Sequence, residues 1–420
     1  MTQNDSRHGT DRGRRAFMKL TGGTVAGVSM ATAGCLGGGG GGGGTDEVRI
    51  PGLYDISGAT SDVGKPSAVG SRDAIKWLNE NDELAQTIDH PWNDYAYDVA
   101  AAKQNFDEYT SDSNPPVIIG WGTADTEALA PQVARNNIVY ISASYSDKLL
   151  SPETPYNFFG NLDYTSQARA HLKWISENDP EGTVAFIFSN TAFGKSPVEG
   201  GRAYAEELGL DLAPDINLPL TASSASTQLK KAKQNDVDYL IHQNTAAPMQ
   251  VLLKDRQDVY PEVTVMGLTY TIDELRAQGS PEIFEGARYA SGFKTFAEAL
   301  DAGGKGTTLI EDSFDREGRS MDDPAVANLN YVRGVIHALL AMKGVKEANN
   351  QDLDPTMGEN IRTGMLAIDG WDVWGLAPPF TYEDGDRRPT MTGRTYEVTD
   401  GELQFDQTVD LPRRDEWIPE

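Results

Sequence analysis

Two short apolar segments of this 420-residue chain end in residues that carry hydroxyl groups. Thr123 follows the segment 117–120, and the run Ser-Ala-Ser-Tyr at 142–145 ends the segment 138–142. Hydroxyls and free backbone N–H groups bind small polar molecules by hydrogen bonds, without a metal or a nucleophile. The pattern predicts a ligand site, although a Thr at the start of a helix is also an ordinary N-cap.

A similar order of residues returns about 120 residues later in the chain. Thr245 follows the apolar segment 239–243, and the run Leu-Thr-Tyr-Thr at 268–271 follows the segment 263–267. This weak repeat indicates two similar units. In open parallel sheets, ligands bind beyond the carboxyl ends of the strands, which is where these hydroxyls would lie. We therefore expect the ligand in a cleft between two lobes.

Short apolar runs alternate with longer amphipathic stretches along the chain. Strands are expected at residues 48–53, 117–120, 138–142, 184–189, 239–243, 263–267 and 286–293. Helices are expected at residues 67–79, 99–109, 126–136, 165–177, 197–208, 227–234, 247–258 and 325–343. Strands that alternate with helices of this length form βαβ units and parallel sheets. The predicted fold class is α/β, with two similar Rossmann-like lobes.

No spacing typical of catalysis or metal binding occurs in the sequence. The five histidines have neither an HExxH spacing nor a neighbouring ligand; they are His8, His90, His171, His242 and His337. The segment 120–125 lacks the third glycine of a dinucleotide fingerprint. Asp369 and Asp372 could form a glycosidase pair, but acids are so numerous that such pairs arise by chance. We expect a protein that is not an enzyme, with no cofactor and no metal; a secreted carbohydrate-active hydrolase is an alternative.

The chain is strongly acidic, with 63 acidic and 36 basic residues and a formal net charge of −27. The acids are dispersed in short groups, which is typical of a solvated surface rather than a docking tail. Concentrated salt screens the repulsion between such charges, so we interpret them as the surface of a halophilic protein of haloarchaeal type. An acidic metal-binding surface and a partner for a basic macromolecule are the competing interpretations. Nucleic acid is not expected as a partner, because no basic patch occurs.

The first 34 residues resemble a twin-arginine signal peptide. Its export motif is matched by Arg14, Arg15, Phe17 and Lys19, although Gly13 stands where the motif has Ser or Thr. The apolar stretch 20–33 is shorter than the roughly 20 residues of a membrane span and fits a signal h-region. The resemblance implies export of a folded protein by the twin-arginine translocase.

The only cysteine, Cys35, ends the run Thr-Ala-Gly-Cys at 32–35. This run resembles a lipobox, in which the cysteine becomes the lipidated first residue of the mature protein. A single cysteine excludes an intramolecular disulfide. The glycine run 37–44 favours a flexible tether. We expect residues 35–45 to anchor the protein to the outer face of the cytoplasmic membrane, and hydropathy predicts no membrane span after them.

Segments distributed over residues 46–420 carry a further resemblance. They are 53–58 with 63–64, 118–120, 139–144, 186–190 with 193–194, and 375–382. Their pattern resembles the substrate-binding proteins of ABC importers, of the type I branched-chain amino acid and amide-binding family. The resemblance implies a three-crossover hinge with crossings near Leu162, Ser291 and Gly375. Lobe 1 would comprise residues 46–162 and 291–375, and lobe 2 residues 163–290 and 376–420.

The resemblance also implies which residues hold a ligand between the lobes. In lobe 1 these are Thr123, Ala124, Ser142, Ala143, Ser144 and Tyr145, and in lobe 2 Tyr164, Phe193, Thr245, Thr269 and Tyr270. Amino-acid binders place an acid at the apparent counterpart of Thr269, and Asp163 or Asp125 could replace it here. The ligand that the resemblance implies is accordingly a branched-chain amino acid, an amide or urea-like compound, or a small carboxylate.

The function implied by the resemblance is capture of a small polar solute by an exported, monomeric lipoprotein. The loaded protein would deliver the solute to an ABC permease complex in the membrane. Ligand-driven closure of the lobes requires a higher affinity of the ligand for the closed form. A surface sensor lipoprotein without a transport role is an alternative. A structural or adhesive lipoprotein ranks lower, because β-sandwich repeats and Thr-rich stalks are not seen.

Overall fold

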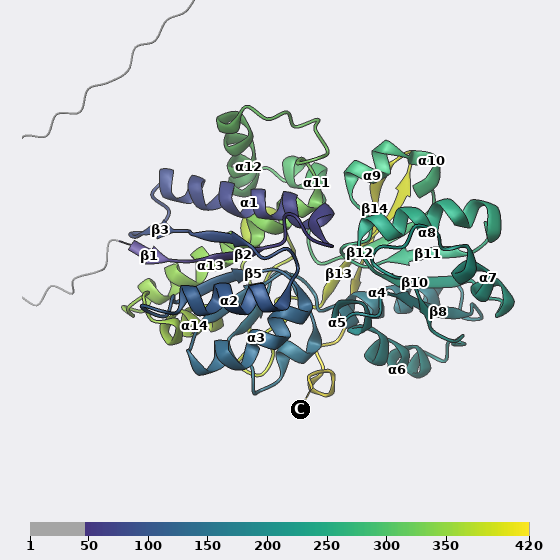
Figure 1. Cartoon of the computed structure of the whole chain (residues 1–420), viewed down its shortest axis with the longest axis horizontal. Helices are drawn as coiled ribbons and strands as arrows, with labels where there is room; N and C mark the ends of the chain where they lie inside the picture. Colours follow the sequence, from purple (N-terminus) through teal and green to yellow (C-terminus); the bar gives the residue numbers. More distant parts are fainter. Residues whose placement is uncertain (1–46, 420) are drawn as a thin grey trace, which may run out of the picture. The chain divides into compact units, whose positions relative to one another are not determined.

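The computed structural model describes residues 47–419, which belong to one compact unit (Figure 1). The export motif with Arg14 and Arg15, the cysteine Cys35 and the glycine run 37–44 lie outside the described residues. Among the described helices, none is long and apolar enough to cross a membrane.

A five-stranded parallel sheet is built from the first part of the chain, in the order β4-β2-β5-β6-β7. Its strands are β2 (Gly52–Tyr54), β4 (Trp92–Asp94), β5 (Val117–Gly120), β6 (Val139–Ser142) and β7 (Asn157–Phe159). Every residue of β5 and β6 is buried, so both faces of the sheet are covered, as is usual for parallel sheets. A separate parallel pair joins β1 (Glu47–Arg49) to β3 (Thr87–Asp89).

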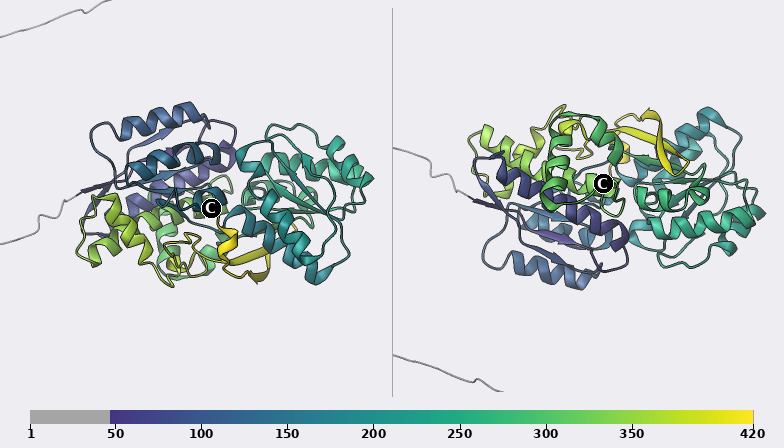
Figure 2. Two further views of the ribbon diagram at one scale, coloured as in Figure 1. Left: turned by 90° about the horizontal axis from the view of Figure 1, so that it is seen from below. Right: turned by 90° about the horizontal axis from the view of Figure 1, so that it is seen from above.

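Helices from distant parts of the sequence pack around this sheet. They are α1 (Ser61–Glu80), α2 (Val99–Tyr109), α3 (Thr123–Arg135), α12 (Gly304–Glu317), α13 (Leu329–Asn350) and α14 (Gly358–Leu366). α1 packs along α13, and Figure 2 shows the purple and blue N-terminal elements beside the yellow-green α13 and α14. A Cβ on Gly334 would lie only 1.9 Å from the carbonyl oxygen of Ser67, so a glycine lets the two helix backbones touch.

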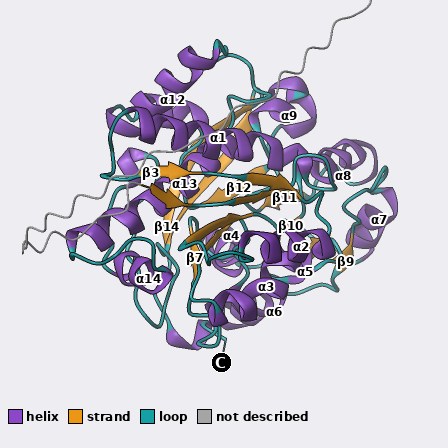
Figure 3. Ribbon diagram, turned by 60° about the vertical axis from the view of Figure 1, so that its left-hand side comes forward, coloured by secondary structure: helices purple, strands orange, loops and turns teal. Residues whose placement is uncertain are grey.

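A seven-stranded sheet follows the order β14-β13-β12-β11-β10-β8-β9. Its strands are β8 (Val184–Phe188), β9 (Ile216–Asn217), β10 (Tyr239–Gln243), β11 (Thr264–Gly267), β12 (Arg288–Ser291), β13 (Thr392–Thr399) and β14 (Glu402–Asp410). The pairs from β9 to β12 are parallel, whereas β13 and β14 form an antiparallel hairpin on the β12 edge. Figure 3 shows the orange strands among the surrounding purple helices.

The helices beside this sheet pack in two pairs. One pair is α4 (Tyr164–Asn178) with α6 (Val198–Leu208), and the other is α7 (Ser226–Gln234) with α8 (Ala246–Val259). Shorter helices complete the connections; they are α5 (Ala192–Lys195), α9 (Glu274–Gly279), α10 (Pro281–Phe284), α11 (Phe296–Asp301), η1 (Asp147–Leu150), η2 (Val373–Gly375) and η3 (Asp415–Trp417).

The predicted α/β class with parallel sheets is confirmed. The two copies of the sequence repeat form the units β5-α3-β6 and β10-α8-β11, each with a parallel strand pair in its own sheet. The division into two lobes at Leu162, Ser291 and Gly375 stays a prediction.

Some element boundaries differ from the prediction for identifiable reasons. Residues 48–53 are not one strand, because β1 and β2 lie in different sheets and are separated at Pro51, which has no N–H to donate. The helix expected from residue 325 begins at Leu329, after the side chain of Asn328 accepts hydrogen bonds from the first turn. The hairpin 392–410 and the helices α12 and α14 were not predicted.

Candidate ligand-binding site

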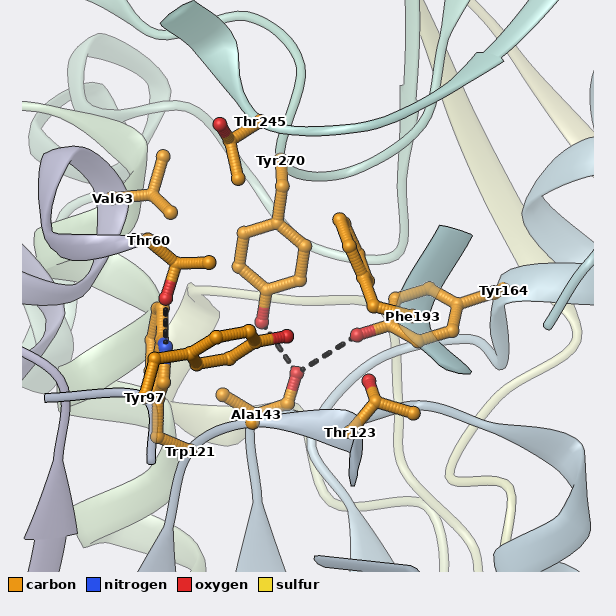
Figure 4. A pocket seen from close by; sticks show the side chains of 11 residues that line it. Thr60, Val63, Tyr97, Trp121, Thr123, Ala143, Tyr164, Phe193, Thr245 and Tyr270 are labelled. Atoms are coloured by element: carbon orange, nitrogen blue, oxygen red, sulfur yellow. Dashed lines mark hydrogen bonds between the residues drawn. The ribbon is translucent and has the colours of Figure 1, made fainter. Parts of the chain in front are cut away.

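A small cavity lies where the carboxyl ends of strands from both sheets face each other (Figure 4). The centre of a water molecule can occupy about 20 Å³ of this cavity. This is roughly the space that one water molecule needs. Its lining residues come after β2, β4, β5, β6, β8, β10 and β11 and from the start of α4; they are Thr60, Val63, Tyr97, Trp121, Gly122, Thr123, Ala143, Tyr164, Phe193, Thr245 and Tyr270.

Six of the eleven residues expected to hold a ligand line this cavity. They are Thr123, Ala143, Tyr164, Phe193, Thr245 and Tyr270. The other five do not line it; they are Ala124, Ser142, Ser144, Tyr145 and Thr269. The structure thus brings together hydroxyls from the ends of strands in both sheets.

Thr123 is the first residue of α3, and its N-cap Gly122 has no side chain to cap the helix. The N–H of Gly122 donates to the hydroxyl of Tyr95 at 3.0 Å, and that hydroxyl donates to Oδ1 of Asp125, also at 3.0 Å. A Cβ on Gly122 would lie 2.2 Å from the same carboxylate oxygen, so this close approach requires glycine. The helix therefore begins at the cavity, and its positive dipole end favours an anionic or carbonyl group there.

Ser142 and Ser144 support Thr123 from behind the lining. The hydroxyl of Ser142 accepts from the N–H of Ser144 at 2.8 Å. The hydroxyl of Ser144 donates to Oγ1 of Thr123 at 3.1 Å. Oγ1 of Thr123 accepts this bond, so its own proton can be donated to a further acceptor. Both serines position the hydroxyl of Thr123 without lining the cavity themselves.

The carbonyl oxygen of Ala143 accepts hydrogen bonds from two tyrosines. The hydroxyl of Tyr164 lies 3.2 Å from it and that of Tyr270 lies 2.5 Å from it (Figure 4). Ala143 follows β6 of the five-stranded sheet, whereas Tyr270 follows β11 of the seven-stranded sheet. These bonds hold the two walls of the cavity together.

Tyr145 and Thr269 lie behind Tyr270. The hydroxyl of Tyr145 is 3.0 Å from Nε2 of His337, and its ring stacks at 10° to the ring of Tyr270. Thr269 is fully buried, and its hydroxyl accepts from the side chain of Asn161 at 3.0 Å. Thr269 therefore supports the wall of the cavity rather than facing its interior.

Sequence reasoning missed five lining residues, namely Thr60, Val63, Tyr97, Trp121 and Gly122. The indole Nε1 of Trp121 donates to Oγ1 of Thr60 at 2.8 Å, and this hydroxyl donates to Oδ2 of Asp55 at 2.7 Å. Thr60 and Val63 lie at the start of α1, which follows β2. Thr123 likewise lies at the start of α3, which follows β5. Applying the strand-end rule to β2 as well would have found them. Trp121 is both buried and part of the lining.

None of the lining residues carries a formal charge, and five of them are aromatic. The two acids considered as partners for a ligand ammonium lie outside the lining. Burial raises the pKa of Asp125 to about 6, and Tyr95 donates to its carboxylate. Asp163 is the N-cap of α4 and accepts from the N–H of Ser166 at 2.8 Å. Asp125 thus supports the start of α3 through Tyr95, and Asp163 caps the start of α4.

The alternatives that need a catalytic or metal site gain no support from the geometry. Within residues 47–419, no three His, Cys, Asp or Glu side chains form a group that could hold a metal ion. Asp369 and Asp372 are exposed and make local bonds, to the hydroxyl of Thr381 and the N–H of Trp374. This pair lies outside the cavity.

Comparison with known proteins gives a family match over most of the chain. The family model of the periplasmic binding proteins matches residues 47–402. A search of curated proteins finds no match. Among solved structures, an ABC transporter substrate-binding protein from Aeropyrum pernix is 29% identical with a TM-score of 0.82, over 89% of this chain and 98% of that chain.

Two further structures share the fold at lower identity. A branched-chain amino acid ABC transporter protein from Thermus thermophilus with bound valine is 23% identical with a TM-score of 0.81, over 88% of this chain and 97% of that one. A solute-binding protein from Rhodopseudomonas palustris in complex with 3,4-dihydroxybenzoic acid is 16% identical with a TM-score of 0.69, over 87% and 98%. The chain therefore belongs to the periplasmic binding protein family and has the type I fold of ABC-transporter substrate-binding proteins.

Proposed function

We propose that this protein captures a small solute in the cavity between its two sheets and delivers it to the permease of an ABC importer. The observation that carries the proposal is the cavity itself, which is lined by residues after strands of both sheets and bridged by Tyr164 and Tyr270. Membership of a family of binding proteins agrees with the expectation that the chain is not an enzyme. Because the cavity in this structure has room for about one water, binding of a larger solute requires the two sheets to move apart first.

The ligand we propose is a carboxylate or amide without an α-amino group. Its polar head would accept hydrogen bonds from the hydroxyl of Thr123 and the start of α3, and its apolar body would contact the aromatic rings of the lining. A buried ammonium requires an acidic partner, and the lining offers none. Valine in the Thermus protein and a hydroxylated benzoic acid in the Rhodopseudomonas protein both contain a carboxylate, which supports this shared chemistry.

Thermal and chemical unfolding in molar salt with candidate ligands tests the proposal. The panel contains valine, leucine, 3-methylbutanoate, 3-methylbutanamide, urea and 4-hydroxybenzoate. A ligand at 100 times its Kd should raise the free energy of unfolding by about 2.7 kcal/mol. If no compound stabilises the protein and none binds in calorimetry, solute capture is contradicted.

A threonine substitution tests the position of the site. Thr123→Val keeps the side-chain shape but removes the hydroxyl, and should weaken the best ligand about tenfold or more, as expected for a hydrogen bond to a charged group. Thr363→Val on α14 is the matched control, because Thr363 bonds only to its own helix and lies outside the cavity. Equal affinities of the parent and Thr123→Val would remove Thr123 from the site.

We propose that Cys35 carries a lipid anchor and that the twin-arginine translocase, reading Arg14 and Arg15, exports the folded protein. The sequence motifs support both points. We also propose that the protein acts as a monomer on the outer face of the cytoplasmic membrane and works in concentrated salt. The dispersed acidic residues support a salt-adapted surface.

A further inference from the structure

The N-terminus of α8 is capped by a side chain from another part of the fold. Thr245, its N-cap residue, makes no side-chain hydrogen bond to the helix. Instead, the N–H of Ala247 donates to Oδ2 of Asp62, in the first turn of α1, at 3.2 Å. The first N–H groups of a helix need acceptors, and the helix dipole favours a carboxylate there. Asp62 thus caps α8, the helix that follows β10 of the seven-stranded sheet.

Arg276 binds the same carboxylate oxygen. Its Nη2 lies 3.2 Å from Oδ2 of Asp62, and each side chain is about 20% exposed. Asp62 follows β2 of the five-stranded sheet, whereas Arg276 lies in α9, after β11 of the other sheet. One oxygen atom therefore joins one side of the cleft to two segments of the opposite side.

Asp62 gains little from its own side of the cleft. Its second oxygen, Oδ1, is buried and has no hydrogen-bond partner among the described residues. A partly buried carboxylate with few partners is costly, and the contacts to Ala247 and Arg276 offset part of that cost. Separation of the two sheets would return the carboxylate to water and break both contacts together.

The position of Asp62 connects these contacts to the ligand cavity. Thr60, two residues before Asp62, and Val63, directly after it, line the cavity, and so does Thr245 at the start of α8. A movement that takes α1 away from α8 would therefore open the cavity wall and break the contacts of Asp62 at the same time.

We propose that Asp62, Ala247 and Arg276 form a latch that holds the cavity closed around its solute; the proposal rests on the function of solute capture. The latch would stabilise only the closed form. A contact that stabilises one of two conformations shifts the equilibrium toward that conformation. Loss of a helix cap together with a partly exposed ion pair should raise the Kd of the solute about tenfold. The change should appear mainly in the dissociation rate, because the latch must break before the solute can leave.

Three variants separate the two contacts. Asp62→Ala removes both, Asp62→Asn keeps a neutral acceptor for Ala247, and Arg276→Gln removes only the ion pair. The control is Arg202→Gln, because Arg202 forms a partly exposed ion pair with Asp215 at 2.8 Å within the seven-stranded side. With valine, 3-methylbutanoate and 4-hydroxybenzoate as probes, stopped-flow dissociation should be fastest for Asp62→Ala and intermediate for the other two. A dissociation rate for Asp62→Ala equal to that of the control overturns the latch.

A second measurement needs no ligand. Lys65 on α1 and Lys254 on α8 are exposed, so Lys65→Cys and Lys254→Cys in full-length Cys35→Ser protein accept one spin label on each side of the cleft. Adding Asp62→Ala should move the interlabel distance distribution to longer distances, and Arg202→Gln should leave it unchanged. Coincident distributions with and without Asp62→Ala overturn the latch. If no probe binds the parent protein, solute capture fails, and the label distances still decide whether the latch exists.

Discussion

The guanidinium of Arg333 lies over the ring of Tyr270, with 3.9 Å between its Cζ atom and the ring centroid. The same group donates to the carbonyl and the hydroxyl oxygen of Thr269, at 2.6 and 3.0 Å. Arg333 is fully buried, and its other hydrogen-bond partner, Asn330, is also uncharged. A buried cation thus lies one aromatic ring behind the ligand cavity.

The position of Arg333 beside Tyr270 predicts that the affinity for a ligand depends on the charge of that ligand. Arg333→Met should weaken binding of 3-methylbutanoate about fivefold and binding of the neutral 3-methylbutanamide much less, because a nearby cation attracts an anion through the protein interior. Calorimetric titration of both ligands measures the difference. Comparing an acid with its amide cancels any general damage to the fold. Arg72→Met is the control, since Arg72 stacks on Trp92 at 4.3 Å on the protein surface. An equal loss for acid and amide would contradict the prediction.

The pH dependence of stability should contain a contribution from Glu274. Its carboxylate accepts from the N–H groups of Phe296 and Leu329, at 3.1 and 2.9 Å, and burial raises its pKa from 4.5 to about 7. Because the folded pKa is the higher one, this contribution is complete below pH 4.5 and is lost as the pH rises through about 7. In Glu274→Gln, the fall in unfolding free energy between pH 4.5 and 7.5 should shrink by up to roughly 3 kcal/mol.

Denaturant titrations across that pH range test the contribution of Glu274. Subtracting the parent profile removes the contributions of other buried groups, such as Asp273, whose pKa burial raises to about 6. Glu177→Gln, which alters an exposed acid at the end of α4, serves as the control. Parallel profiles for the parent and Glu274→Gln would show that this carboxyl does not titrate as described.

The close contact of α1 and α13 should not tolerate a methyl group. Gly334→Ala would place a Cβ against the carbonyl of Ser67 and should destabilise the fold by about 1–3 kcal/mol, because both helix backbones must move apart. Gly279→Ala is the matched control, since nothing lies within 4 Å of the Cβ that it would add. Chemical denaturation of both variants measures the effect. If Gly334→Ala loses no more unfolding free energy than Gly279→Ala, the two helices can move apart at little cost.

Lipid anchoring through Cys35 predicts a change of location. Cys35→Ala should move the protein from the membrane fraction to the soluble fraction of cells, because the thiol that accepts the lipid is missing. Immunoblotting of both fractions measures the shift, and a second variant, Arg14→Lys with Arg15→Lys, should instead reduce export. Membrane association that persists in Cys35→Ala would remove the anchor from this residue.

The sequence predicted the parallel α/β architecture because short apolar runs alternate with amphipathic stretches along it. It also located Thr123 and Thr245, since a residue after a strand end is specified by chain position alone. It could not separate Thr123, which faces the cavity, from Ser144, which supports it. That distinction depends on side-chain direction across two elements, which no local pattern encodes.

The elements that the sequence did not reveal depend on distant contacts. Many residues of β14 are exposed, so the strand lacks a strong apolar period. Its pairing with β13, which in turn pairs with β12, becomes clear only in the folded sheet. The role of Arg333 was hidden for a similar reason. Its partner Thr269 lies 64 residues away, and only folding brings α13 behind the end of β11.

The carbonyl of Ala143 has a consequence for solute selection. A carbonyl oxygen has two lone pairs, and the hydroxyls of Tyr164 and Tyr270 occupy both. A solute that brings its own N–H donor must therefore compete with two donors already built into the protein, whereas a solute that brings only acceptors leaves them undisturbed. The two tyrosines therefore compete with a solute N–H at this one carbonyl, and the N–H of an amide ligand must find its acceptor elsewhere in the lining.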